Sequence, residues 1–90
     1  MKPPAKRDCV FQVEFLADLR FWVQEDRRIA LRIMDFAEAI LRDPFDGPGK
    51  PEALRFDLAR CWSRRITQEH RLVYRVTSQR IDFLVCRYHY

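Results

Sequence analysis

Few side chains in this sequence could carry acid–base chemistry near neutral pH. His70 and His89 are its two histidines, and imidazole is the group that ordinarily titrates in that range. Cleaving RNA without a metal needs a base for the 2′-OH proton, an acid for the departing 5′ oxygen and a cation for the charge that grows on the phosphate. The chain holds residue types for all three roles.

Each of these roles has a candidate. His89 precedes the terminal carboxylate of Tyr90, whose charge would favour a protonated imidazole if the two are close, so His89 is a candidate acid. Glu52 is a candidate base, and Arg71 or Arg65 is a candidate phosphate clamp. An isolated glutamate or histidine is more often an ordinary surface residue, and an arginine on a strand usually solvates an edge. Spacing alone therefore makes a weak case.

Composition bounds the class of protein. Ninety residues with 48% hydrophobic content suit one compact domain. The net charge of +4 favours acidic partners, and 14 of the 17 basic residues are arginines, whose planar fork suits phosphates. A modest positive charge is also common in ordinary soluble domains, so composition does not decide for nucleic-acid binding.

The cysteines and the hydropathy pattern exclude several other classes. Cys9, Cys61 and Cys86 lie far apart, with no Cys-x-x-Cys and no histidine pair at ligand spacing, which argues against a disulfide framework and a zinc site. No run approaches the roughly 20 apolar residues of a membrane span, and no apolar run follows the charged start. We expect a cytoplasmic protein with a flexible tail over residues 1–8 and one domain over residues 9–90.

Two amphipathic helices are predicted in the first half of the chain. The first apolar stripe consists of Phe15, Leu16, Leu19, Trp22 and Val23. The second consists of Ile29, Ile33, Phe36, Ala37 and Ile40. Asp26 can cap the second helix, and Asp43-Pro44 must end it. The short break between the stripes predicts an antiparallel pair.

A loop and then a sheet follow the helices. Residues 44–52 hold three of the five prolines and both glycines, so they form a loop, and loops on rigid scaffolds often carry functional groups. The hydrophobic period then changes to two, which predicts strands near residues 54–57, 61–67, 71–77 and 80–88. We expect an antiparallel meander. The predicted fold is therefore α+β, with two N-terminal antiparallel helices packed on one face of an antiparallel β-sheet.

The last two strands suggest a register. A two-residue turn at Ser78-Gln79 predicts three apolar pairs on the core face: Val76 with Ile81, Tyr74 with Phe83, and Leu72 with Val85. On the other face it pairs Arg75 with Asp82. That face would carry six residues: Arg71, Val73, Arg75, Leu84, Cys86 and Tyr88. Arginines and an aromatic ring could bind single-stranded RNA there, although an ordinary solvated sheet face fits as well.

The same alternation raises a difficulty for His89. It places His89 on the face opposite Arg71, so the two could not act on one phosphate. We therefore expect the chain to turn or bulge after Tyr88.

Three stretches match one pattern of uncommon residues: PFDGPGKPEAL at residues 44–54, WSRRITQEHRLVY at 62–74 and CRYHY at 86–90. They resemble the YoeB/Txe toxins of type II toxin–antitoxin systems, within the RelE-like superfamily. The resemblance covers residues 10–90, and the stretch 62–74 is highly specific. The chain departs from the family mainly at its start, where residues 1–8 form an extra tail.

The resemblance implies a RelE-like, microbial-RNase-like fold. It also implies that the protein is a ribosome-dependent endoribonuclease, an mRNA interferase that cleaves A-site mRNA and inhibits translation. It further implies that this reaction uses no metal or other cofactor. By position, Glu52 would be the general base, His89 the general acid, Arg71 the transition-state cation and Tyr90 a positioning or catalytic residue. The residues expected to contact RNA are Lys50, Arg55, Arg65 and Tyr88.

The resemblance also implies partners. These are the ribosome and its mRNA, a second copy of the toxin, and a Phd/YefM-type antitoxin whose carboxyl-terminal segment wraps the toxin. Operator DNA would be bound only through the antitoxin complex. One alternative is a non-catalytic toxin of the same fold, similar to the ParE proteins that bind gyrase, which has no need of Glu52, Arg71 and His89-Tyr90. Another is a basic RNA-binding domain, which would not need the carboxylate of Glu52.

Overall fold

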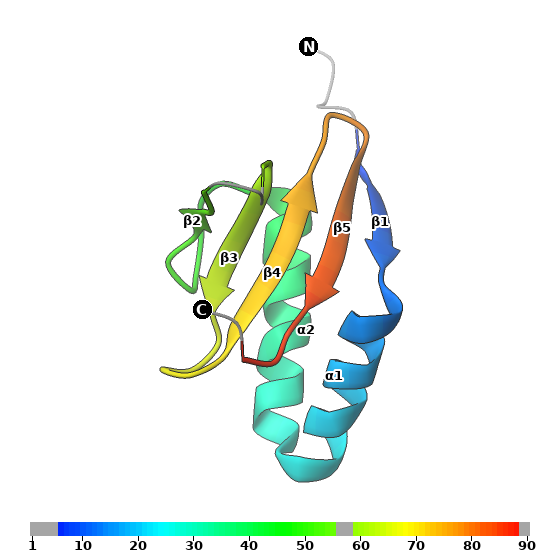
Figure 1. Ribbon diagram of the computed structural model, residues 1–90, viewed down its shortest axis with the longest axis vertical. Coiled ribbons are helices and arrows are strands. Elements are labelled where there is room, and N and C mark those ends of the chain that lie inside the picture. The colour runs from blue at the N-terminus through cyan, green and yellow to red at the C-terminus, as the bar shows by residue number, and fades with distance from the viewer. Residues whose placement is uncertain (1–5, 56–58, 89–90) are drawn as a thin grey trace.

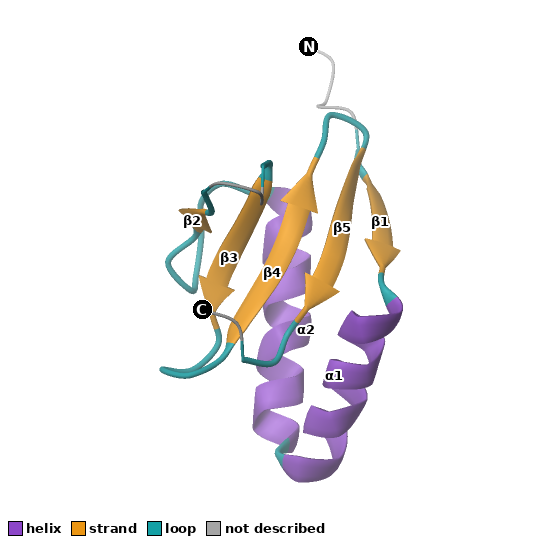
Figure 2. Ribbon diagram, viewed as in Figure 1, coloured by secondary structure: helices purple, strands orange, loops and turns teal. Residues whose placement is uncertain are grey.

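The computed structural model describes residues 6–55 and 59–88. The elements in chain order are β1 (Asp8–Phe11), α1 (Val13–Glu25), α2 (Arg27–Arg42), β2 (Glu52–Ala53), β3 (Cys61–Arg65), β4 (Arg71–Val76) and β5 (Arg80–Val85). Figure 1 shows both helices on one side of the sheet, and Figure 2 shows the opposite face open toward the viewer. The predicted α+β fold with two N-terminal helices on a sheet is confirmed.

The helices form where the apolar stripes predict them. The Asp26 side chain accepts a hydrogen bond from the backbone N–H of Arg28 at 3.1 Å, so it caps α2 as expected. The helix ends at Arg42, immediately before Asp43-Pro44, because the residue before a proline disfavours helical backbone. Neither helix in the described part of the chain is long and apolar enough to cross a bilayer.

The sheet has five strands in the order β1-β5-β4-β3-β2. Three of the pairings are antiparallel, as the predicted meander requires, but β1 pairs with β5 in parallel, so the sheet is mixed. No strand was predicted at β1, because its four residues show little alternation and their partners lie about 70 positions away. Arg7 also contacts the sheet: its Nε donates to the Thr77 carbonyl at 2.9 Å.

The strands are shorter than predicted. β5 ends at Val85 rather than near residue 88, and β3 ends at Arg65 rather than near residue 67. The predicted strand at 54–57 is replaced by the short β2, Glu52–Ala53, and residues 56–57 lie outside the described residues.

The predicted register holds only for the first half of the β4–β5 pair. Val76 pairs with Ile81, Arg75 with Asp82 and Tyr74 with Phe83. Val73 then pairs with Val85, where Leu72 was predicted, because β5 has one extra residue at this point.

The bulge reverses the faces of the residues that follow it. Cys86 is fully buried in the core, although strict alternation predicted it on the open face. Val85, predicted in the core, is only partly buried. The deviation from a regular strand thus begins well before Tyr88, where we had expected it.

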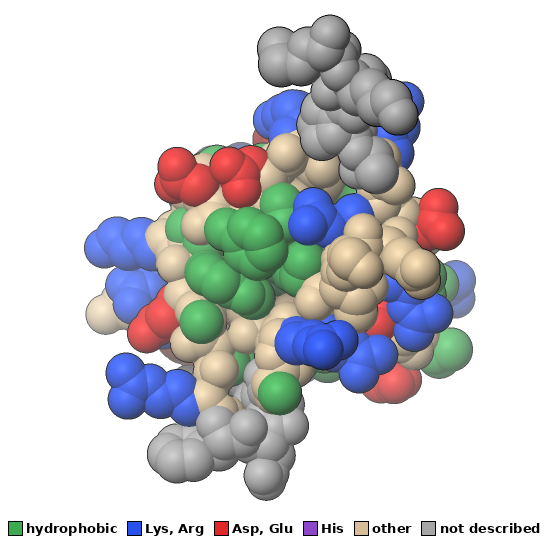
Figure 3. All heavy atoms as spheres, turned by 90° about the horizontal axis from the view of Figure 1, so that it is seen from above, with side chains coloured by type: hydrophobic (Ala, Val, Ile, Leu, Met, Phe, Trp, Pro, Cys, Tyr) green, Lys and Arg blue, Asp and Glu red, His purple; other side chains and the backbone are tan. Residues whose placement is uncertain are grey.

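The core lies between the helices and the covered face of the sheet. Its fully buried aromatic residues are Phe15, Tyr74 and Phe83, and the ring centroids of Phe15 and Phe83 are 5.5 Å apart. Figure 3 views the molecule from the end where β1 begins, and hydrophobic side chains gather there with basic side chains on several sides.

Candidate active site

Glu52 and Arg71, far apart in the sequence, meet on the open face of the sheet. Glu52 pairs with Ser63 across β2 and β3, and Arg71 begins β4 on the other side of β3. Arg71 Nη1 lies 3.8 Å from Glu52 Oε2 and donates to Ser63 Oγ at 3.4 Å. The Glu52 side chain is 67% exposed and that of Arg71 24% exposed, so one end of the ion pair is open to a ligand and the other is held in place.

A hollow of about 310 Å³ surrounds this pair. Its lining residues are Glu52, Leu54, Ser63, Gln68, Glu69 and Arg71. Sequence reasoning had not proposed Ser63, Gln68 or Glu69 as site residues. Ser63 could have been found from its place between Glu52 and Arg71, but the predicted strand at residues 54–57 did not include Glu52, so the pairing of Glu52 with Ser63 was not predicted.

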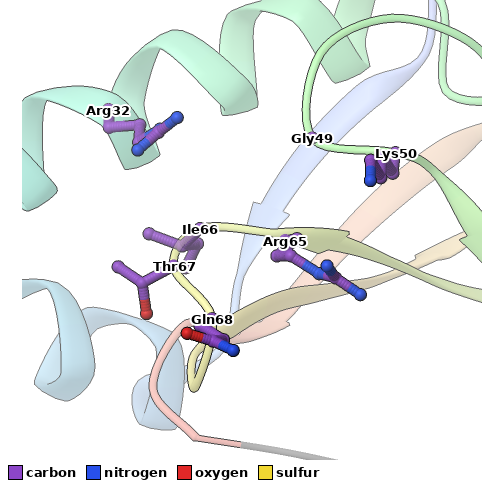
Figure 4. Close-up of a pocket in the computed structure, with 7 residues that line it drawn as sticks. All are labelled: Arg32, Gly49, Lys50, Arg65, Ile66, Thr67 and Gln68. Carbon is purple, nitrogen blue, oxygen red and sulfur yellow. The ribbon is translucent and has the colours of Figure 1, made fainter.

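A second hollow of about 440 Å³ adjoins the loop before β2, and it is basic. Figure 4 shows its cations coming from three elements: Arg32 from α2, Lys50 from the loop and Arg65 from the end of β3. Within the described residues none of these three forms an ion pair. Lys50 and Arg65 were predicted RNA contacts, whereas Arg32 was not, because a cation on an exposed helical turn gives no signal in the sequence.

The loop that carries Lys50 and Glu52 is held from beneath by a buried arginine. Arg64 is fully buried. Its guanidinium donates to the carbonyl oxygens of Asp43 at 2.7 Å, Asp46 at 3.0 Å and Pro48 at 3.2 Å. The Tyr74 hydroxyl donates to the Pro44 carbonyl at 2.6 Å, and burial raises the pKa of this phenol. A single charge therefore satisfies the carbonyls of a loop that has no regular structure.

Two glycines allow the loop to approach this arginine and α2. Gly47 and Gly49 have positive φ angles of 128° and 87°. A Cβ on Gly49 would lie 2.7 Å from the ring of Phe36, and one on Gly47 would lie 2.8 Å from Arg64 Nη1. Position 49 therefore requires glycine for backbone conformation and for space, and position 47 requires it for backbone conformation.

The chain leaves β5 after Val85 and bends back toward Arg71. Tyr88 has a positive φ of 57°, and its carbonyl oxygen accepts a hydrogen bond from the Arg71 N–H at 3.0 Å. The Tyr88 N–H donates to His70 Nδ1 at 2.8 Å. His70, one of the two histidines in the sequence, packs between the rings of Trp22 and Tyr88.

The remaining predicted site residues are Tyr88, Arg55, His89 and Tyr90. Tyr88 is exposed, and its ring packs on His70. The residue lies beyond the end of β5 and so does not belong to a strand. Arg55 is exposed and, within the described residues, makes no hydrogen bond or ion pair with Glu52 or Arg71. His89 and Tyr90 lie outside the described residues.

The same fold occurs in solved toxin–antitoxin complexes of low sequence identity. The toxin–antitoxin complex of DinJ and YafQ from Escherichia coli contains a chain that superimposes with a TM-score of 0.82 over 93% of this chain and 94% of that one, at 14% identity. At this identity the likeness shows the fold alone.

Family membership follows from closer matches. The family model described as a YoeB-like toxin of bacterial type II toxin–antitoxin systems matches residues 11–90. Toxin YoeB of Escherichia coli K12 is 44% identical over 81 residues, which cover 90% of this chain and 96% of the relative. Toxin RelK of Mycobacterium tuberculosis is 46% identical over 84 residues, covering 93% and 99%. The chain therefore belongs to the YoeB-like toxins, as the sequence resemblance predicted.

Solved structures agree with this assignment. A YoeB/ParE toxin from Agrobacterium tumefaciens superimposes with a TM-score of 0.85 at 44% identity, over 92% of this chain and 99% of that one. The YoeB dimer from Staphylococcus aureus gives a TM-score of 0.84 at 36% identity, over 96% and 100%. The YoeB of a YoeB–YefM complex from the same organism gives 0.81 at 34% identity, also over 96% and 100%. The chain is the toxin of a type II toxin–antitoxin system.

Proposed function

We propose that this toxin is a metal-independent endoribonuclease that cleaves mRNA in the ribosomal A site and so inhibits translation. The observation that carries the proposal is the Glu52–Arg71 pair, 3.8 Å apart on the open face of the sheet. The basic hollow lined by Arg32, Lys50 and Arg65 adds sites for RNA phosphates.

Glu52 and Arg71 suit the two ends of an attack by the 2′-OH. Glu52 removes the 2′-OH proton, and the freed oxygen attacks the neighbouring phosphorus while Arg71 stabilises the charge on the phosphate oxygens. The bond to the 5′ oxygen then breaks as that oxygen takes a proton from the acid. The products are a 2′,3′-cyclic phosphate and a 5′-hydroxyl end.

We assign the acid role to His89 and a positioning or catalytic role to Tyr90. This assignment is supported by Tyr88, the residue before His89, whose carbonyl oxygen accepts a hydrogen bond from Arg71. The last described residue is therefore tied to the backbone of the residue that we propose to be the catalytic cation. Lys50, Arg55, Arg65 and Tyr88 are proposed to contact RNA.

The proposed partners follow the relatives. The Staphylococcus aureus relatives were solved as a YoeB dimer and as YoeB–YefM complexes. We propose that this chain likewise forms a homodimer, is neutralised by a Phd/YefM-type antitoxin and meets operator DNA only through that complex.

The proposal is tested by inducing the toxin in cells and mapping mRNA 5′ ends. Wild type should arrest growth and produce cuts in phase with codons. Glu52→Gln should slow cleavage by about 100-fold or more, because it removes the base while keeping the side chain's shape. His89→Ala should also suppress the cuts, because it removes the acid.

Glu69→Gln is the matched control, since Glu69 lines the same hollow and the change is chemically identical. It should leave the cuts largely intact. Growth arrest without codon-phased cuts would instead indicate a binding toxin of the ParE kind. Cleavage of free RNA by purified toxin, as fast as on ribosomes, would contradict ribosome dependence.

A further inference from the structure

His70 does not line the hollow around Glu52 and Arg71, yet it holds the described end of the chain. Its Nδ1 accepts the Tyr88 N–H at 2.8 Å. Its ring centroid lies 4.7 Å from that of Tyr88 and 4.7 Å from that of Trp22. The imidazole is thus packed between α1 and the end of the chain.

Other contacts hold the preceding residues of the same segment against α1. Trp22 Nε1 donates to the Cys86 carbonyl at 2.9 Å. The Cys86 N–H donates to Asp18 Oδ2 at 3.0 Å. The Arg87 guanidinium lies 3.5 Å from the ring centroid of Phe21. These contacts with α1 fix the path of the chain from Cys86 to Arg87. His70 contacts the next residue, Tyr88.

Tyr88 adopts a conformation that needs such support. Its φ of 57° lies in the left-handed region, which residues other than glycine adopt at a cost. Its N–H donates to His70 and its C=O accepts from the N–H of Arg71, so the two partners are consecutive residues. The dipeptide that presents the proposed catalytic cation therefore also holds the residue to which His89 is attached.

We propose that His70 is a positioning residue of this active site. Its Nδ1 holds Tyr88 in the left-handed turn and thereby fixes the position of the residue to which His89, the proposed acid, is attached. The role requires a neutral ring that carries its proton on Nε2, because Nδ1 must be an acceptor. The inference rests on the proposed nuclease function, to which it adds the device that orients the acid.

Three substitutions of His70 distinguish the effect of its hydrogen-bond acceptor from the effect of its aromatic ring. His70→Asn puts a carbonyl oxygen close to the position of Nδ1. His70→Gln carries the same amide one bond further, toward the position of Nε2, and is the matched control. His70→Phe keeps an aromatic ring between Trp22 and Tyr88 but removes the acceptor.

Two measurements are made on each full-length variant. One is the single-turnover rate of cleavage of a defined mRNA in the A site of purified ribosomes, together with its dependence on ribosome concentration. The other is the amide NMR signal of Tyr88, which reports the hydrogen bond directly. Melting temperatures establish that each variant is folded.

We expect His70→Asn to keep the Tyr88 amide signal near its wild-type position and to cleave at a similar rate. His70→Gln and His70→Phe should shift that signal, and their cleavage should slow by up to about 100-fold, because a misplaced acid loses its alignment. Half-saturation by ribosomes should change little. If His70→Phe does not fold, the Asn and Gln pair decides alone.

The positioning role is overturned if His70→Gln cleaves as fast as wild type, or if His70→Asn is as slow as His70→Gln. A wild type that cuts no mRNA would overturn the proposed nuclease function instead. In that case the Tyr88 signal still tests the hydrogen bond: a shift in Gln and Phe but not in Asn supports it, and no shift in any variant overturns it.

Discussion

At the scale of single residues, Glu52 and Arg71 attract each other as opposite charges, while Glu52 stays exposed to solvent. The carboxylate neutralises part of the cation's charge, yet at 3.8 Å and with Glu52 mostly exposed the ion pair is weak. In the proposed reaction, an RNA phosphate replaces Glu52 at Arg71 and leaves the carboxylate free to act as the base. The Ser63 hydroxyl keeps Arg71 in place when this exchange occurs.

The three thiols should differ sharply in reactivity. Cys9 is exposed, whereas Cys61 and Cys86 are buried. Burial, reinforced by the charge of Asp18, raises the pKa of the Cys86 thiol. We expect a disulfide reagent at mildly alkaline pH to modify Cys9 in the folded protein and the other two only on unfolding, because the thiolate is the reactive form. Modification of Cys86 as fast as that of Cys9, measured by peptide mapping, would contradict the observed burial.

The same shift predicts a pH dependence of stability. A thiol whose pKa is raised by folding contributes stability that is fully present below the pKa of the unfolded thiol, about 8.5, and is lost as the pH rises above it. The free energy of unfolding should therefore fall above about pH 8.5. The fall should be smaller in Cys86→Ala, which has no thiol to ionise.

At the scale of elements, the loop between α2 and β2 depends on Arg64. Its three bonds to loop carbonyls hold the segment that carries Lys50 and Glu52. We expect Arg64→Met to lower the free energy of unfolding by about 3 kcal/mol, because buried hydrogen bonds from a charged donor are lost. Cleavage should fall as well, because the loop positions Glu52. Denaturant unfolding and the cleavage assay measure the two effects.

Arg65→Met is the control for this prediction. Arg65 is adjacent in the sequence but exposed on the open face, so its loss should weaken RNA binding with little effect on unfolding. Equal stability losses in the two variants would argue that Arg64 has no special role in holding the loop.

At the scale of the whole molecule, the net charge of +4 is less informative than its distribution. Arg32, Lys50 and Arg65 come from separate elements and line one hollow (Figure 4). We expect Arg32→Ala to weaken binding of a single-stranded RNA oligonucleotide. It should also reduce the slope of log affinity against log salt by about 0.7, the value for one phosphate contact on single-stranded nucleic acid.

Arg20→Ala is the matched control, because Arg20 is exposed on α1 and lines neither hollow. Both proteins carry the same net charge, so a general effect of charge would change their slopes equally. A fluorescence titration over a range of salt concentrations distinguishes the two outcomes.

Much of the architecture was determined by the sequence itself. Local rules placed both helices, the cap at Asp26, the stop at Asp43-Pro44 and the turn at Ser78-Gln79, because each depends on residues a few positions apart. The stretch 62–74 indicated the family, and the family model confirmed it. Glu52 and Arg71 were named as candidates from their chemistry and from this resemblance.

Only the tertiary structure decided how these candidates are arranged. The parallel pairing of β1, the bulge in β5 and the meeting of Glu52 with Arg71 each depend on partners distant in the chain, which local periodicity does not encode. The bulge moved Cys86 into the core, and the turn at Tyr88 returned the chain to Arg71. Arg64 and His70 acquired their roles in the same way, because a buried guanidinium or a ring acceptor is defined by the groups that surround it.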